Sequence, residues 1–412
     1  MPIPLKNPEP LIGGCKGGAG LYTIAVMTAA AHDSLGTHER QDLPPALTSL
    51  DAARALLLAG LAPVAPRNVP VAEAQGLISA PMPPFAALVP QRARATRDGW
   101  AMCARDLAGA SPFSPVMLAK PPVWVDLGDA LPDGCDCVID PQGLELLTGH
   151  AQVSVEAYPG ENIRRAGEDL AAGTSPLREG QNLGALDLLV LRGAGVETVM
   201  VRRPRVLLID TPARDGAETT AQLILRLLDD AGAYGTLMSA QDWGADAMFD
   251  TLTTIDADLL LTIGGTGAGR HDATIQTLAK RGTLLAHGIA MLPGRSAALA
   301  RVAGRPVIAL PGSPDHALAA FWALVDPALD ILSARAPRAE ISLPLTRKIA
   351  SQVGMAEFVL LMRERGQFTP IASGDLPLHR LAQATHVCLV PAGSEGHAPG
   401  ETISARSLRS QA

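Results

Sequence analysis

The chain has 412 residues, a formal net charge of −7 and 47% hydrophobic residues. This length allows several buried cores, and we expect about two to four domains. The acidic balance argues against a general binder of nucleic acids or anionic membranes, so any bound anion is expected to be held by local geometry. With 40 glycines and 34 prolines, the chain is expected to contain many short elements and turns.

Cysteine usage and hydropathy indicate the compartment. The five cysteines are odd in number and lack the paired spacing of a zinc site, which fits a reduced, cytoplasmic environment. No apolar run reaches the roughly 18 residues that a membrane-spanning helix needs. We therefore predict a cytoplasmic protein with no membrane and no nucleic-acid partner, in which residues 1–44 form a flexible N-terminal extension.

The next part of the chain predicts one helix. The segment "SLDAARALLLAGL" has apolar residues at helical spacing, and Thr48 and Asp51 bracket its start. We expect residues 45–80 and 160–203 to form an N-terminal linker or helical domain.

A small β domain is predicted between these two segments. Residues 81–159 are rich in proline and glycine and contain short strand-like runs such as "PVWVDLG" and "CDCVID". We therefore expect residues 81–159 to be a β domain inserted into the surrounding domain.

Strand and helix patterns alternate from residue 204 to residue 335. The runs "RVLLID", "ADLLLTI" and "RPVIAL" predict buried strands. Such alternation predicts an α/β fold with a parallel sheet, right-handed crossovers and helices on both faces. One intervening helix ends at Gly232. Its expected core stripe is Leu223, Ile224, Leu227, Leu228 and Ala231.

The alternation stops after Pro337, and residues 336–412 predict a C-terminal β domain. The segment "EFVLLMRERGQFTPI" is typical of two strands joined around Gly366, and "THVCLVPAG" predicts another strand. The whole chain is thus expected to be an elongated α/β protein with small β domains.

A glycine-rich turn, "IGGTGAGRHD", follows the strand that ends at Ile263. A turn of this kind before a helix presents backbone N–H groups that suit a phosphate or another oxyanion, and Asp272 is placed to cap the helix. No Gly-Lys-Ser/Thr follows, which excludes a P-loop. A dinucleotide-dependent oxidoreductase stays as an alternative, because Gly265, Gly267 and Gly269 alternate, although the last is one residue early.

A second turn, "PGSPDH", follows the strand that ends at Leu310. Ser313 before Pro314 predicts a capping hydroxyl ahead of a proline in the first helical position. Ligands of parallel sheets bind at the carboxyl ends of the strands, so the two turns are expected to face one anion.

Several motifs in order resemble one family, the molybdopterin molybdenumtransferases (the MoeA and gephyrin E-domain family). "ATRDGWAM" and "NIRRAGEDL" are similar to two of its motifs, and "IGGTGAGRHD" and "LPGSPDHA" are similar to its two glycine turns. "ALPDGCDCVI" adds a weaker match. The resemblance covers roughly residues 45 to 405, and the shared order and spacing of the motifs carry it.

The resemblance implies a MogA-like three-layer molybdopterin-binding domain within an elongated homodimer. It implies insertion of molybdate into molybdopterin or adenylyl-molybdopterin, with Mg²⁺ as cofactor. It assigns catalysis to Asp98, Asp169 and Asp272, of which Asp98 and Asp272 would hold the metal. The pterin-binding residues that it implies are Gly264, Gly265, Thr266, Gly267, Gly269, Arg295, Pro311, Gly312, Ser313 and Pro314.

Each aspartate also has a structural explanation. Asp98 precedes a glycine, as in a common turn, Asp169 is within reach of an ion pair with Arg164 or Arg165, and Asp272 suits a helix cap. The coincidence of all three with family positions favours the functional interpretation.

The chain departs from the family at its cationic segment, where the family has three lysines. Here "GIAMLPGRS" has Gly288 and Leu292 at the first two positions, and only Arg295 keeps the charge. Arg214 stands where a glutamate is usual, and Arg270 is the only cation of the glycine turn. These departures leave a second hypothesis: a molybdopterin-binding scaffold or chaperone for a client molybdoenzyme, without turnover.

Overall fold

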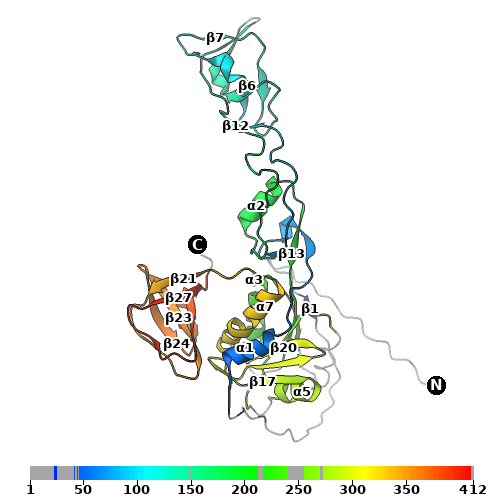
Figure 1. The fold of residues 1–412 in the computed structure, drawn as a ribbon, viewed down its shortest axis with the longest axis vertical. Coiled ribbons are helices and arrows are strands. Elements are labelled where there is room, and N and C mark those ends of the chain that lie inside the picture. The colour runs from blue at the N-terminus through cyan, green and yellow to red at the C-terminus, as the bar shows by residue number, and fades with distance from the viewer. Residues whose placement is uncertain are drawn as a thin grey trace, which may run out of the picture.

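The computed structural model describes residues 23–25, 41, 44, 46–147, 150–211, 217–239, 255–269 and 272–409. The molecule is elongated, as Figure 1 shows, with a small β domain at one end and an α/β unit at the other. None of the described helices is long and apolar enough to span a bilayer.

The α/β unit is built on a seven-stranded sheet in the order β1-β15-β14-β16-β20-β19-β17. The first five are mutually parallel, and all three strands predicted from apolar runs lie among them. The bounds are β1 Thr23–Ala25, β14 Arg205–Asp210, β15 Tyr234–Ser239, β16 Leu259–Ile263, β17 Thr283–His287, β19 Ala298–Val302 and β20 Arg305–Leu310.

One edge of this sheet is antiparallel, which the sequence pattern did not predict. β19 and β20 are joined by a two-residue hairpin at Ala303 and Gly304, both with positive φ, and β17 pairs antiparallel with β19. A two-residue hairpin forces antiparallel pairing, so the sheet is parallel in its centre and mixed at this edge.

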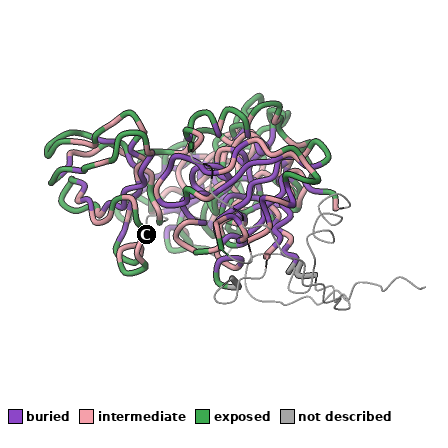
Figure 2. Tube along the Cα trace, turned by 90° about the horizontal axis from the view of Figure 1, so that it is seen from below, coloured by how far each residue is buried: buried purple, intermediate pink, exposed green. Residues whose placement is uncertain are grey.

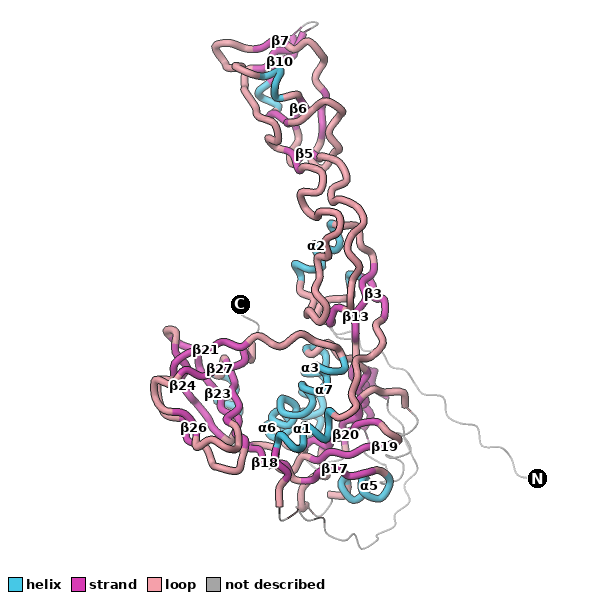
Figure 3. Tube along the Cα trace, in the orientation of Figure 1, coloured by secondary structure: helices cyan, strands magenta, loops and turns pink. Residues whose placement is uncertain are grey.

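Helices cover both faces of the sheet and complete three layers, as Figure 3 shows. On one face, Ile224 and Leu228 of the helix before Gly232 share a core with Leu208 and Leu261 of the strands. On the other face, Ile275 packs in a second core. The helices are α3 Ala217–Asp230, α5 Thr274–Arg281, α6 Pro314–Ala320 and α7 Asp326–Leu332, with a π-helical turn, Phe321–Val325, between α6 and α7.

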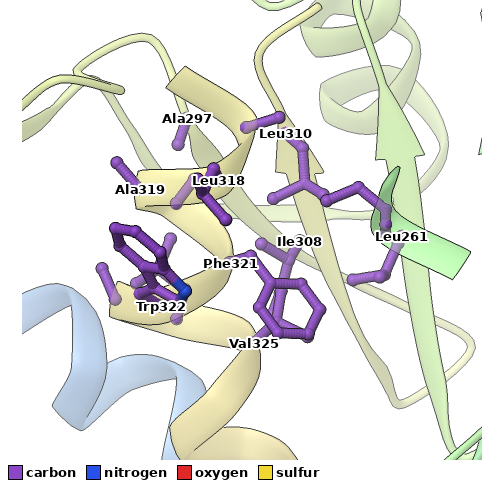
Figure 4. Packing of buried hydrophobic residues seen from close by; sticks show 14 of the residues in the cluster. Leu261, Ala297, Ile308, Leu310, Leu318, Ala319, Phe321, Trp322 and Val325 are labelled. Carbon is purple, nitrogen blue, oxygen red and sulfur yellow. The ribbon is translucent and has the colours of Figure 1, made fainter. Parts of the chain in front are cut away.

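The centre of the first core lies where α6 and the π-helical turn cross the sheet. Figure 4 shows Phe321 beside Ile308 and Leu261, with Val325 next to it. All four side chains are buried. Figure 2, seen along the long axis, shows buried residues gathered in the α/β unit. This packing fixes the carboxyl edge of the sheet, where the strands end in the two predicted turns.

The middle of the chain is a three-stranded sheet made by segments far apart in sequence. β13 (Thr198–Arg202) pairs antiparallel with both β3 (Arg67–Pro70) and β4 (Ile78–Ser79), and α2 (Ala185–Gly193) packs beside them. The predicted helix, α1 (Leu50–Leu58), instead buries its apolar face in the α/β core.

The distal β domain contains the strands expected from "PVWVDLG" and "CDCVID", which are β8 and β9 around the central β6. Its strands are short, and its cores are small compared with that of the α/β unit. The bounds are β5 Arg94–Ala95, β6 Gly99–Met102, β7 Val116–Met117, β8 Val123–Val125, β9 Cys137–Ile139, β10 Leu144–Leu147, β11 His150–Val153 and β12 Ile163–Arg164.

The C-terminal β domain contains the predicted hairpin, β23 and β24, turning at Arg365 and Gly366 with φ of 49° and 76°. Its sheet runs β2-β18-β23-β25-β27-β21, so β18 from the α/β unit extends it. A short helix, α8, was not predicted. The bounds are β2 Thr48–Ser49, β18 Ile289–Leu292, β21 Glu340–Pro344, β22 Ile349–Ala350, β23 Ala356–Glu364, β24 Gln367–Ser373, α8 Leu378–Gln383, β25 His386–Val390, β26 Gly396–His397 and β27 Thr402–Ser407.

Candidate functional site

The two predicted turns meet at the carboxyl edge of the sheet. β16 and β20 are parallel neighbours, with Ile263 beside Leu310 at their ends. The N–H of Gly264 donates to the carbonyl of Leu310 at 2.9 Å. A Cβ on Gly312 would lie 3.5 Å from Cα of Gly264. The turns are thus in van der Waals contact, as their positions after neighbouring strands predicted.

The first turn needs glycine at its first two positions. Gly264 and Gly265 have φ of 85° and 68°, a region that L side chains rarely adopt. A Cβ on Gly265 would lie only 2.1 Å from Oγ1 of Thr274. That hydroxyl donates to the carbonyl of Gly264 at 3.0 Å and is buried at the start of α5. The turn is therefore folded tightly against the helix that follows it.

Side chains from distant segments bind three successive carbonyls of this turn. Nε2 of Gln41 donates to the carbonyls of Gly265, at 3.2 Å, and Gly267, at 2.7 Å. Nε2 of His287, at the end of β17, donates to the carbonyl of Thr266 at 3.0 Å. Gln41 is 5% exposed although it belongs to the N-terminal extension. The turn is held from outside its own strand and helix.

These bonds determine where the N–H groups of the turn point. Each peptide is planar and trans, so a carbonyl held on one side directs the N–H of the following residue to the opposite side. The three N–H groups concerned are those of Thr266, Gly267 and Ala268, and none has an acceptor in the part of the chain that the structure describes. Successive N–H groups of a turn that have no acceptor within the chain are donors available to an oxyanion.

Asp272 does not cap α5, and that prediction was wrong. The helix begins at Thr274 behind Ala273, with no side-chain cap. Oδ2 of Asp272 instead accepts the N–H of Gly269 at 2.9 Å, because the carboxylate folds back over the turn. A Cβ on Gly267 would lie 2.9 Å from the same oxygen. The carboxylate is half-exposed and lies on the turn itself.

The second turn matches the prediction in position but not in bonding. Ser313 occupies the N-cap position of α6 and Pro314 the first helical position, yet the serine hydroxyl makes no capping hydrogen bond. The expected capping bond was therefore wrong, whereas the helix start was confirmed. The turn is held from α3, where Oγ1 of Thr220 donates to the carbonyl of Gly312 at 2.8 Å. Pro311 before it is buried.

Asp98 and Asp169 lie far from Asp272 within one chain. Asp98 precedes β6 in the distal domain and accepts the N–H of Leu127 at 2.6 Å. Asp169 accepts Nη1 of Arg164 at 2.5 Å, which is the ion pair that the sequence allowed. Figure 1 places β6 and β12 at the opposite end of the molecule from α5. Among the described residues, no three His, Cys, Asp or Glu side chains gather to hold a metal ion.

One of the two lost lysine positions has a structural explanation. Gly288 is buried with φ of 75°, where the chain passes from β17 in one sheet to β18 in the other. A Cβ there would lie 2.9 Å from Cδ2 of Leu47. Leu292 ends β18 and is half-buried, whereas Arg295 beyond it is exposed. A lysine at Gly288 would therefore be strained by the left-handed backbone and would require Leu47 to shift.

Arg214 and Arg270 lie outside the described residues. Arg295 lies among the described residues, on the loop after β18.

Sequence reasoning missed Gln41 and His287. Neither belongs to a recognisable motif, and Gln41 is 224 residues from Gly265. His287 directly precedes the segment with the lost lysines, which was its only sequence cue.

The fold and the site define a class: an α/β ligand-binding unit with paired turns at its carboxyl edge, carried in an elongated multidomain chain. Two family models match this chain. Residues 48–195 match the MoeA N-terminal region (domain I and II), and residues 206–331 match a probable molybdopterin binding domain. The chain belongs to the molybdopterin molybdenumtransferase (MoeA) family.

Individual relatives agree with this family. The chain is 29% identical to molybdopterin molybdenumtransferase 2 of Mycobacterium tuberculosis over 360 residues, covering 77% of this chain and 88% of the relative. It is 26% identical to the molybdopterin molybdenumtransferase of Synechococcus elongatus, covering 88% and 100%. A MoeA protein structure from Pyrococcus horikoshii has the same fold, with a TM-score of 0.64 at 23% identity, covering 88% of this chain and 100% of that one.

Proposed function

We propose that this chain is a molybdopterin molybdenumtransferase, an enzyme of molybdenum cofactor biosynthesis that inserts molybdate into adenylylated molybdopterin. The observation that carries the assignment is the row of N–H groups of Thr266, Gly267 and Ala268 on the glycine turn, opposite carbonyls bound by Gln41 and His287. The named relatives support this activity over the alternative of a binder without turnover.

The glycine turn supplies donors for the phosphate groups of the pterin substrate. Hydrogen bonds to a charged oxygen contribute about 1.5–3 kcal/mol each, so three N–H groups hold an oxyanion without a lysine. Asp272 lies on the same turn, and we assign its carboxylate to orienting the water that attacks the adenylylated phosphate. Gly312 of the second turn contacts Gly264, at the start of the same glycine turn.

Arg295 is the cation that we assign to molybdate. It is exposed on the loop after β18, and no side-chain ion pair engages it in the described part of the chain. With Gly288 and Leu292 in place of lysines, molybdate meets fewer positive charges than the family pattern provides. We therefore expect weak binding of molybdate rather than loss of the reaction.

We also propose a homodimer in the cytoplasm. Leu186, Leu189 and Val190 are 76%, 67% and 41% exposed along one face of α2, which suits burial against a second copy. In such a dimer, Asp98 and Asp169 of one copy would approach the turn of the other. Asp98 and Asp272 of a single chain do not fit a shared Mg²⁺ ion, because they lie at opposite ends of the molecule. A client molybdoenzyme is a further proposed partner.

Turnover of adenylyl-molybdopterin tests the assignment. We expect the purified protein to cleave it in the presence of molybdate and to release molybdenum cofactor that activates an apo-molybdoenzyme. Binding without cleavage would select the scaffold or chaperone hypothesis. Protein that neither binds nor cleaves the compound would reject both. A titration with NAD(H) and NADP(H) tests the oxidoreductase alternative, for which we expect no binding.

A further inference from the structure

A cavity lies where the middle domain, the α/β unit and the C-terminal sheet meet. Its volume is about 360 Å³. The loop 180–182 forms one wall, and the linker 335–339 after α7 forms another. Three of the side chains that line it are arginines, namely Arg335, Arg338 and Arg406.

Two of these arginines are paired with carboxylates of α7. Nη2 of Arg338 lies 2.9 Å from Oδ1 of Asp326 and 2.9 Å from Oδ1 of Asp330. Nη1 of Arg406 lies 2.5 Å from Oδ2 of Asp326. Asp326 is buried, with 7% of its side chain exposed. Three guanidinium groups thus face two carboxylates, which leaves one positive charge in excess.

The excess charge belongs to Arg335. Its Nη1 atom is buried and has no hydrogen-bond partner among the described residues. Burial, together with the neighbouring Arg338 and Arg406, lowers the pKa of Arg335, because nearby positive charges disfavour its charged form. Buried donors are almost always paired, so an unpaired buried Nη1 atom on a side chain that lines a cavity requires an explanation.

The backbone keeps Arg335 at this position. The residue before it, Ala334, has φ of 51°, and the N–H of Arg335 donates to the carbonyl of Asp330 at 2.8 Å. The N–H of Ala336 donates to the carbonyl of Gly180 at 2.9 Å, which ties the linker to the middle domain. A Cβ on Gly180 would lie 2.5 Å from the carbonyl oxygen of Ala334, so the contact requires glycine. The main chain of Arg335 is therefore fixed beside the cavity.

We propose that this cavity binds a small oxyanion through Arg335, with Arg338 and Arg406 beside it. Guanidinium forks bind carboxylates and phosphates through paired hydrogen bonds, and one excess positive charge matches a singly charged group. The volume accommodates an oxyanion carried on a small organic molecule.

This site is separate from the glycine turn. The helical stretch from Pro314 to Leu332 runs between them, and at 1.5 Å per residue it is about 28 Å long. A ligand here would contact three parts of the chain at once.

Thermal unfolding of the full chain, with phosphate and acetate as separate probes at constant ionic strength, tests the proposal. Phosphate also stabilises folded proteins by exclusion from their surface, so the measurement is the difference between variants. We expect a saturable rise in Tm for the wild type and an apparent affinity at least tenfold weaker for Arg335→Met. Arg105→Met, whose parent side chain is 89% exposed in the distal domain, should respond like the wild type. The probe that binds with the higher apparent affinity shows whether the site prefers a phosphate or a carboxylate.

The same variants give a second readout without ligand. In buffer free of both oxyanions, Arg335→Met should unfold at or above the Tm of the wild type, because it removes no ion pair. A lower Tm would mean that the guanidinium already has a partner, and it would overturn the proposal. Equal responses of the wild type and Arg335→Met to both probes would also overturn it.

Discussion

The two turns at the carboxyl edge of the sheet touch each other, yet they are held in different ways. Side chains from the N-terminal extension and from β17 bind the carbonyls of the turn after β16. The turn after β20 has one such bond, from Thr220 to Gly312. The first turn thus combines bound carbonyls with three N–H groups that have no acceptor among the described residues, and these donors remain available to a ligand.

The largest effect is expected from Gly265→Ala. The new Cβ would lie 2.1 Å from the buried Oγ1 of Thr274, in a left-handed backbone conformation. Overpacking and backbone strain together should lower the free energy of unfolding by about 2–4 kcal/mol. Binding of adenylyl-molybdopterin should fall below detection by calorimetry at a temperature where the variant stays folded. Wild-type affinity in a folded variant would show that the ligand binds elsewhere.

Asp272→Asn tests the charge of the first turn. The asparagine oxygen still accepts the N–H of Gly269, so the turn is kept while the negative charge is lost. Turnover of adenylyl-molybdopterin should fall about a hundredfold with an unchanged Tm. Asp315→Asn makes the same change in the first turn of α6 and serves as the control. It should leave turnover within about threefold, because this carboxylate is not assigned to the reaction and the change removes at most a weak interaction. Equal turnover of Asp272→Asn and wild type would remove Asp272 from the mechanism.

Gln41→Ala removes two of the bonds that orient the first turn. Each hydrogen bond contributes about 1 kcal/mol, so affinity for the pterin substrate should weaken roughly tenfold. Thr220→Val removes the corresponding bond of the second turn while keeping the shape of the side chain, and it should change affinity less. Calorimetric titration of both variants measures the difference. If Thr220→Val had the larger effect, the second turn would be the main binding element.

Gly312→Ala should have the smallest effect. Its new Cβ would lie 3.5 Å from Cα of Gly264, an ordinary contact. The free energy of unfolding should therefore change by no more than about 0.5–1 kcal/mol, and a gain is expected if the backbone conformation suits alanine. Urea unfolding checks this result. A loss as large as that of Gly265→Ala would mean that both turns need glycine equally.

The sequence predicted the strands and turns that are determined by the residues within them. Continuous apolar runs identify β16 and β20, because strands buried on both faces exclude polar residues. The hairpin around Gly366 follows from turn chemistry in the same way. Local cues also placed the two turns correctly, since neighbouring parallel strands end at the same edge.

The parts that the sequence could not predict depend on long-range contacts. Gln41 reaches the turn from 224 residues away, and no periodicity records such a contact. The cap assigned to Asp272 was wrong because the N–H of Gly269 competes for the same carboxylate, and spacing does not decide between two donors. The antiparallel edge of the sheet was missed because it depends on the hairpin at Ala303 and Gly304.

Gly288 is where the chain leaves the central sheet and joins the C-terminal one. His287 lies immediately before this crossing, and Arg295 lies just beyond β18, which pairs with β23. The C-terminal sheet is thus connected, through β18, to the segment that carries both residues. A movement of this sheet relative to the central one would be transmitted through β18 to the donor of the Thr266 carbonyl and to the cation assigned to molybdate.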